Sequence, residues 1–265
     1  MKLLIHYKKQ TPMDEKLLML NIYYWTRYFK EIDDVAIVGR YRDEEFARLK
    51  DLKLERVFNR AMRDRGDDSQ IGDVCILSFK DIEFKEKFKI INHQLLRAIK
   101  ELGIRNEEFI SSHIDVFPVK EIDRGDLNKE YIIKGMYKRF NPKYDFEILQ
   151  KRAAKWYKEK FNLRDIRIYD GHIFNLITPE LITHITTNKL ENKFPYTMAN
   201  TYYNEVIKDE NVFKRGLINT TFANNKYVWD DSMDYKGVNI TMPTRYESMA
   251  LITDLIKPIL DIVFE

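Results

Sequence analysis

Apolar and polar positions in the first half of the chain follow two alternating patterns. Short apolar runs that suit buried strands occupy residues 2–8, 33–41, 73–79 and 107–117. Apolar residues at helical spacing cover the segments 14–30, 43–52 and 88–103. This alternation predicts an α/β fold, in which a mostly parallel sheet is flanked by helices on both faces. Ligands of such sheets bind beyond the carboxyl ends of the strands.

The second half of the chain is less regular. Its patterns predict a basic helix at about 145–161, a strand at 164–170, a helix start at 178–186 and a C-terminal helix over 246–264. No internal repeat and no low-complexity linker separates the two halves. We therefore expect one domain, whose second half completes and covers the sheet.

Composition excludes several classes of protein. The 265 residues are 44% hydrophobic and 33% charged, with a net charge of +3, which is typical of a globular chain and not of a disordered one. The apolar runs are shorter than the ~18 residues of a membrane span, and the N-terminus lacks a secretion-signal pattern, so we expect a cytoplasmic protein. The single cysteine, Cys75, excludes an intramolecular disulfide and a cysteine-rich zinc site. Glycine-rich phosphate loops and the HExxH, GxSxG and CxxC motifs are absent from the sequence.

A histidine and an aspartate follow each other closely in the segment FISSHIDVFPVKEID, residues 109–123. His113 and Asp115 are two residues apart, and in a strand such side chains face the same side. Together they could bind a divalent cation, and the imidazole nitrogen suits Mn²⁺ better than Mg²⁺. The alternative is that Asp115 caps a turn and His113 is a polar surface residue.

A second pair with the same offset lies in YDGHIFNLITPELI, residues 169–182. Asp170 and His172 flank Gly171, which permits a close backbone approach. His172 is either a third metal or phosphate contact or a hydrogen-bonded histidine at a strand end. Thr178 suits a helix N-cap, with Pro179 at the first helical position.

Carboxylates and aromatic residues gather in the segment 225–237, which contains Trp229, Asp230, Asp231, Asp234, Tyr235 and Lys236. Aromatic rings beside carboxylates can hold a sugar, and one of the acids could act as a general base. The alternative is a solvated polar loop.

The order of these motifs resembles nucleotide-sugar-dependent glycosyltransferases of the GT-A type. It is most similar to the branch of Stealth-like capsule sugar-phosphate transferases and glycosyltransferase-like proteins of tailed phages. The resemblance covers roughly residues 1–240 and rests on short motifs: AIVGR (36–40), INHQLLRAI (91–99), SSHIDVF (111–117), YDGHIFNLITPELI (169–182), NTYYNEV (200–206) and Asp234-Tyr235-Lys236. His113 stands where the family has an acidic residue.

The resemblance implies a GT-A, Rossmann-like fold and a UDP-sugar donor whose diphosphate is bridged by Mn²⁺ or Mg²⁺. Residues 1–120 would form the nucleotide-binding half and residues 121–265 the acceptor half with the C-terminal helix. Metal ligands would be His113, Asp115 and His172. Contacts to the nucleotide sugar would come from Arg40, Asn92, Arg97 and Lys236. Catalytic carboxylates would be Asp230, Asp234 and Asp170.

Basic residues interleaved with aromatic ones predict a macromolecular acceptor. We expect duplex DNA to contact Lys134, Lys138, Arg139, Lys151, Arg152 and Lys155. With the phage resemblance, this favours transfer of an arabinose or glucose type of sugar to hydroxymethylated cytosine in the host cytoplasm, which requires base flipping. Two alternatives stay open: transfer of a sugar or sugar phosphate to a capsule or cell-wall glycan, and a non-catalytic DNA-binding or phage–host interaction protein. The basic helix alone could equally be a solvated amphipathic helix.

Overall fold

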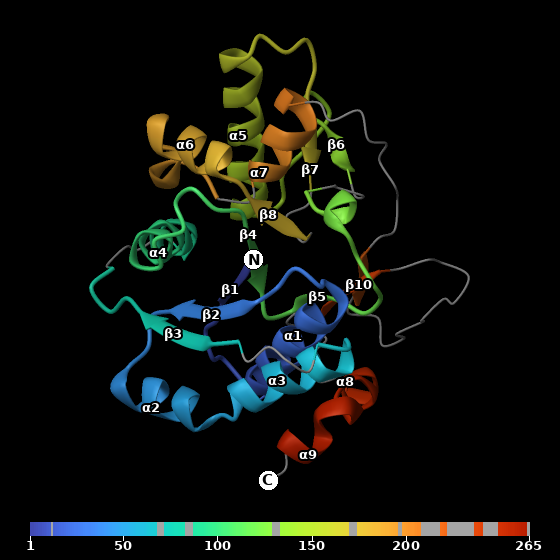
Figure 1. Ribbon diagram of the computed structural model, residues 1–265. Coiled ribbons are helices and arrows are strands. Elements are labelled where there is room, and N and C mark those ends of the chain that lie inside the picture. Colours follow the sequence, from blue (N-terminus) through green and yellow to red (C-terminus); the bar gives the residue numbers. More distant parts are fainter. Residues whose placement is uncertain are drawn as a thin grey trace. The chain divides into compact units, whose positions relative to one another are not determined.

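The computed structural model describes most of the chain and divides it into two compact units (Figure 1). The described residues are 1–11, 13–67, 72–82, 87–128, 133–169, 174–195, 198–207, 218–221, 236–240 and 249–263. Unit 1 comprises Met1–Lys80, Phe109–Arg124 and Gly216–Glu265. Unit 2 comprises Asp81–Glu108 and Gly125–Arg215. The predicted functional halves, 1–120 and 121–265, stay a prediction.

Unit 1 is built on parallel strands. They are β1 (Lys2–His6), β2 (Asp34–Gly39), β3 (Val74–Ser78) and β4 (Phe109–His113). Hydrogen bonding places them in the order β3-β2-β1-β4, and every neighbouring pair is parallel. Leu3, Leu4 and Ile5 of the central strand β1 are fully buried, because the strand has a covered face on each side. The predicted α/β fold with a mostly parallel sheet flanked by helices is confirmed.

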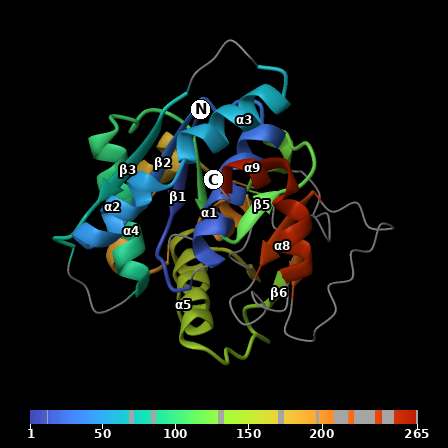
Figure 2. The same cartoon turned by 90° about the horizontal axis from the view of Figure 1, so that it is seen from below.

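Helices cover one face of these strands in unit 1. Their bounds are α1 (Met13–Tyr28), α2 (Asp43–Asp51), α3 (Leu54–Asp64), α8 (Met249–Leu255), a 3₁₀ turn (Lys257–Ile259) and α9 (Leu260–Val263). Figures 1 and 2 show α1 and α3 side by side on the same face of the sheet. Trp25 and Phe58 are fully buried in this layer. The predicted C-terminal helix over 246–264 is interrupted, because Pro258 lies in the 3₁₀ turn between α8 and α9.

A second, smaller sheet completes unit 1. It joins β5 (Val116–Pro118), β10 (Gly237–Ile240) and β9 (Ile218–Thr221). β10 pairs antiparallel with β5 and parallel with β9. The sheets of unit 1 are therefore mixed but mostly parallel.

Unit 2 contains most of the second half of the chain and the helix α4. Its elements are α4 (Lys87–Glu101), β6 (Ile133–Met136), α5 (Asp145–Lys160), β7 (Arg167–Tyr169), β8 (Asn175–Ile177), α6 (Pro179–Thr187), a 3₁₀ turn (Leu190–Asn192), α7 (Ala199–Thr201) and a π-helix (Tyr202–Ile207). Thr178 caps α6 as predicted, because its hydroxyl oxygen accepts a hydrogen bond from Leu181 N at 3.3 Å. Gly103 follows α4 with φ = +69°, the left-handed conformation of a glycine C-cap. The predicted helices and strand of this unit are confirmed.

Buried polar contacts tie β7 of unit 2 to the π-helix. Glu205 on the π-helix accepts hydrogen bonds from Arg167 and from the hydroxyl of Tyr169. Burial and the neighbouring Glu205 carboxylate raise the pKa of Tyr169. A π-helix is uncommon and disrupts the regular hydrogen-bond ladder of a helix. Here the buried Glu205 carboxylate on the π-helix accepts hydrogen bonds from two donors on β7.

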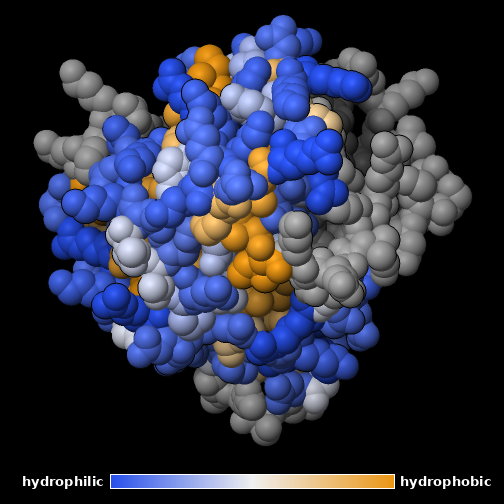
Figure 3. Space-filling view, turned by 90° about the horizontal axis from the view of Figure 1, so that it is seen from above, coloured by the Kyte–Doolittle hydropathy of each residue, from blue (hydrophilic) through white to orange (hydrophobic). Residues whose placement is uncertain are grey.

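Much of the surface is polar, as expected for a chain in which 33% of the residues are charged. The face in Figure 3 is mostly hydrophilic, with an apolar area among the polar side chains. None of the helices in the described ranges is long and apolar enough to cross a membrane.

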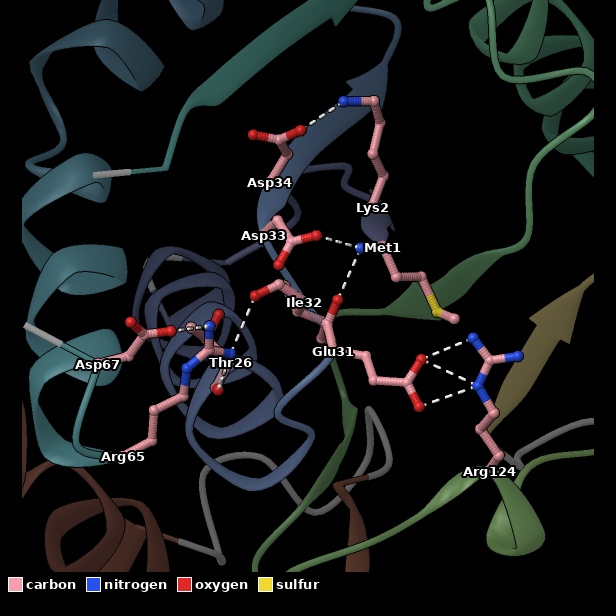
Figure 4. A network of polar contacts seen from close by, with 10 residues as sticks. All are labelled: Met1, Lys2, Thr26, Glu31, Ile32, Asp33, Asp34, Arg65, Asp67 and Arg124. Atoms are coloured by element: carbon pink, nitrogen blue, oxygen red, sulfur yellow. Dashed lines mark hydrogen bonds and ion pairs between the residues drawn. The ribbon is translucent and has the colours of Figure 1, made fainter. Parts of the chain in front are cut away.

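Arg65, just after α3, holds the end of α1 and the start of β2 together (Figure 4). Its side chain is only 3% exposed. It donates hydrogen bonds to the carbonyls of Thr26 at 3.1 Å and Ile32 at 2.9 Å, and it pairs with Asp67 at 3.1 Å. The Thr26 carbonyl is among the last four of α1, which lack partners inside the helix. Arg124 forms a forked ion pair with Glu31, which lies between α1 and β2. This ion pair lowers the pKa of the Glu31 carboxyl.

Arg65→Met should lower the free energy of unfolding by about 2 kcal/mol, because the apolar stem remains while two carbonyls and Asp67 lose their buried donor. Chemical denaturation measures the loss. Arg63→Met is the matched control, since Arg63 is exposed on the same helix. Equal stability of the two variants would contradict the role given to Arg65.

Candidate functional site

The site lies where the strand order of unit 1 reverses. From β1 the chain adds β2 and β3 on one side, and β4 then pairs on the other side of β1. Ligands of open parallel sheets bind at such a reversal, beyond the carboxyl ends of the two strands. Those ends are His6 of β1 and His113 of β4, which are partners in the register of the sheet.

The two histidine rings are neighbours, with centroids 5.7 Å apart and planes inclined by 40°. His6 is buried, and His113 is half-buried. Burial, with a smaller contribution from His113, lowers the pKa of His6 to about 3, so its imidazole is neutral at physiological pH. The sequence motifs singled out His113 and not His6. In the sequence His6 is a polar residue inside the first apolar run, 2–8, and its partner in the sheet is 107 residues away.

Asp115 does not share a strand with His113, which corrects the prediction that 107–117 forms one strand. β4 ends at His113, the chain turns through Ile114 and Asp115, and β5 starts at Val116 in another sheet. The same-side argument for the pair therefore does not apply. Asp115 is half-buried, and its backbone carbonyl accepts a hydrogen bond from Ile240 N at 2.8 Å.

The carboxyl end of β2 lies on the same edge of the sheet. Arg40 follows this strand, is exposed, and has no hydrogen-bond or ion-pair partner among the described residues. Beside it, the Tyr41 hydroxyl donates to the Tyr7 carbonyl at 3.2 Å. A Cβ on Gly39 would lie 2.4 Å from the buried ring of Tyr41, so the glycine of AIVGR makes room for that ring. Arg40 is thus an exposed cation at this edge.

The predicted nucleotide contacts Asn92 and Arg97 belong to unit 2, where both side chains already have partners. Asn92 is buried, and its amide donates to the carbonyls of Glu191 at 3.0 Å and Phe194 at 2.6 Å. Arg97 pairs with Asp81 and with Glu101. These partners fix both residues within unit 2, and their roles toward a ligand stay predictions.

Lys236 is half-buried just before β10, and its carbonyl accepts from Val119 N at 2.8 Å and Lys120 N at 3.3 Å. The remaining predicted site residues lie outside the described residues: Asp170, His172, Asp230 and Asp234. Their roles stay predictions as well.

The predicted DNA contacts lie in and around β6 and α5 of unit 2. Lys134 belongs to β6, and the exposed side chains are Lys138, Arg139, Arg152 and Lys155. Lys151 is used within the unit, because it donates to the Phe140 carbonyl at 2.6 Å and lies over the ring of Tyr137. Lys155 is 3.8 Å from Glu159, a weak exposed pair.

Metal ligands in the site are few. In the described part of the chain, no three His, Cys, Asp or Glu side chains are grouped so that they could hold an ion. His113 and Asp115 nevertheless offer the nitrogen and oxygen donors that Mn²⁺ accepts. Mg²⁺ and related ions at phosphate sites often take one or two protein ligands and complete their shell with substrate phosphates and water. The donor set therefore fits a cation that is shared with a diphosphate.

No family model matches the sequence, and no curated protein matches it. Solved structures that match include the galactosyltransferase LgtC in complex with donor and acceptor sugar analogs, at 11% identity, with 97% of this chain and 95% of that chain covered and a TM-score of 0.43. Mouse xyloside xylosyltransferase 1 in its apo form matches at 10% identity, with 92% and 98% covered and a TM-score of 0.40. Both TM-scores are below 0.5, and neither likeness carries an argument about function.

Proposed function

We propose that this protein is a nucleotide-sugar-dependent glycosyltransferase whose donor diphosphate binds at the carboxyl ends of β1 and β4. The observation that carries the proposal is the pairing of His6 with His113 at the reversal of strand order, two residues before Asp115. The motif order of the sequence, which resembles GT-A enzymes, points to the same edge. Exposed Arg40 adds a positive charge that suits an anionic donor.

The chemistry of transfer requires stabilisation of the leaving nucleoside diphosphate. A divalent cation, when bound, would neutralise the negative charge that grows on the diphosphate. His113 and Asp115 would hold that cation, and Arg40 would pair with a phosphate oxygen. His6, buried behind His113, would keep the neighbouring imidazole in place by ring packing.

The acceptor in this proposal is hydroxymethylated cytosine in duplex DNA, with an arabinose or glucose type of sugar from a UDP donor. Support comes from the exposed cations Arg139, Arg152 and Lys155 and from Tyr144, which is 70% exposed at the start of α5. Cations contact backbone phosphates, and an exposed aromatic ring can stack on an unpaired base.

A transfer assay tests donor and acceptor together. The protein is incubated with Mn²⁺, a panel of UDP-sugars and a duplex that contains hydroxymethylcytosine, and the nucleosides are then analysed by mass spectrometry. We expect a sugar on the modified base, no product with an unmodified duplex, and no product with EDTA. Calorimetry with UDP and Mn²⁺ supplies the second measurement.

The outcomes separate the alternatives. Binding of UDP without transfer to DNA would reject the DNA acceptor and favour a glycan acceptor. Absence of UDP binding would reject the glycosyltransferase and favour a non-catalytic protein. If DNA binds, an Arg152→Gln and Lys155→Gln double variant should weaken DNA binding and flatten its salt dependence, while UDP binding is unchanged.

A further inference from the structure

Three buried side chains meet behind the turn that carries Asp115. Asn21 and Trp25 come from α1 and are fully buried, and Ser112 of β4 is 4% exposed. Asn21 and Trp25 are one helical turn apart, so they present polar groups to the same place. Polar groups in such a position destabilise a fold unless they are hydrogen-bonded, so their partners show what they do.

The partners are the backbone carbonyls on both sides of Ile114 and Asp115. The Asn21 amide nitrogen donates to His113 O at 2.7 Å and to Val116 O at 2.9 Å. Trp25 Nε1 lies 3.1 Å from Ser112 Oγ and 3.2 Å from Val116 O. The Ser112 hydroxyl lies within hydrogen-bond distance of the same two carbonyls, at 3.0 Å and 2.9 Å. Val116 O therefore accepts from both Asn21 and Trp25, while the single hydroxyl proton of Ser112 can serve one of the two carbonyls.

One amide group thus bridges the two ends of the turn, and it also lies 3.3 Å from Ser112 Oγ. The two hydrogens of an NH₂ group diverge by about 120°, so two carbonyl oxygens bonded to them are held about 5 Å apart. The residues between these carbonyls are Ile114 and Asp115. A change in that separation changes where the Asp115 side chain lies relative to the end of β4.

We infer that Asn21 and Trp25 are positioning residues for His113 and Asp115: through the carbonyls of His113 and Val116, side chains of α1 fix the spacing of the two groups that would hold the donor's cation. The inference rests on the proposed function for the role of that spacing. Partners of this kind, one step removed from a metal, change metal affinity by about 10- to 100-fold when they are replaced.

The test compares isosteric variants. Asn21→Leu and Asn21→Asp keep the size of the side chain and remove both N–H donors, and Trp25→Phe keeps an aromatic ring and removes Nε1–H. Leu18→Ala is the control for stability, because Leu18 is fully buried on the same helix and leaves the turn's hydrogen bonds intact. Hydrogen exchange of the amides of 113–117 reports on the turn, and calorimetry with UDP and Mn²⁺ reports on the site. Both are measured well below each variant's melting temperature.

For the Asn21 variants we expect exchange at 113–117 to accelerate and the Kd for UDP with Mn²⁺ to rise about tenfold or more. Trp25→Phe should show a smaller effect in the same direction. This variant carries the test if the Asn21 variants do not fold. Leu18→Ala should bind like the wild type. Unchanged exchange in all three variants would overturn the inference. Faster exchange with a Kd equal to that of Leu18→Ala would also overturn it, because the contacts would then be purely structural. If the wild-type protein does not bind UDP, the donor site itself is rejected, while exchange still decides whether α1 holds the turn.

Discussion

Asp115→Asn is expected to reduce sugar transfer by about a hundredfold or more while the protein stays folded. The substitution keeps the shape of the side chain and removes its negative charge, and Asp115 is only half-buried in its turn. A cation shared with the donor diphosphate needs a negatively charged oxygen from the protein. Steady-state transfer rates, with circular dichroism and melting curves to confirm folding, measure the effect.

Two companion variants make the Asp115 experiment specific. Asp51→Asn is the matched control, because Asp51 is an exposed carboxylate at the end of α2, on another part of unit 1. It should transfer sugar at the wild-type rate. His113→Asp should remain active and prefer Mg²⁺ over Mn²⁺, since an oxygen replaces a nitrogen donor. Full activity of Asp115→Asn would remove Asp115 from the site.

Acid is expected to destabilise the wild-type protein more steeply than a His6→Phe variant. Burial lowers the pKa of His6 from 6.5 to about 3 in the folded protein. Between these two values the unfolded chain binds a proton at His6 that the folded protein does not bind, so folding becomes less favourable as the pH falls. The loss grows by about 1.4 kcal/mol per pH unit and reaches about 2 kcal/mol between pH 7 and pH 5.

The His6 experiment measures a difference in slopes. Urea denaturation of both proteins at several pH values, with EDTA present to exclude metal effects, gives the free energy of unfolding against pH. His184, whose pKa burial also lowers, is present in both proteins and cancels in the comparison. A His6→Gln variant checks that the result does not depend on the phenylalanine ring. Parallel curves for wild type and variants would show that His6 titrates alike in the folded and unfolded states.

Local sequence patterns predicted most elements of the fold. The apolar runs of β1 and β2 are continuous because both faces of these strands are covered, and that signal is visible in the sequence; β3, at the edge of the sheet, is half-buried throughout. The helix α3 was missed, since its many charged residues hide the buried positions Val57 and Phe58. The segment 107–117 was read as one strand because its apolar pattern continues past His113. At the interruption, Asn21 on α1 donates hydrogen bonds to the carbonyls of His113 and Val116, a contact that spacing alone does not show.

The candidate site was predictable only in part. His113 stood out through its neighbour Asp115, and it lies at the carboxyl end of a parallel strand. His6 had no such neighbour in the sequence, and it joins the site only through the register of β1 with β4. Asn92 and Arg97 matched a family motif by position, but their side chains bind backbone and carboxylate groups of unit 2.

The interleaving of the two units along the chain has a consequence for biosynthesis. β5 pairs with β10, so residues 119–236 must leave the ribosome before that sheet can form. The last segment of unit 1 also reaches α1, since the Tyr24 hydroxyl donates to the Leu255 carbonyl at 2.9 Å. Unit 2 ends at Arg215, so all of its residues are synthesised before the final segment of unit 1. The nascent chain therefore carries an open strand edge at β5, next to Asp115, until β10 has been synthesised, and unpaired edges of this kind favour aggregation.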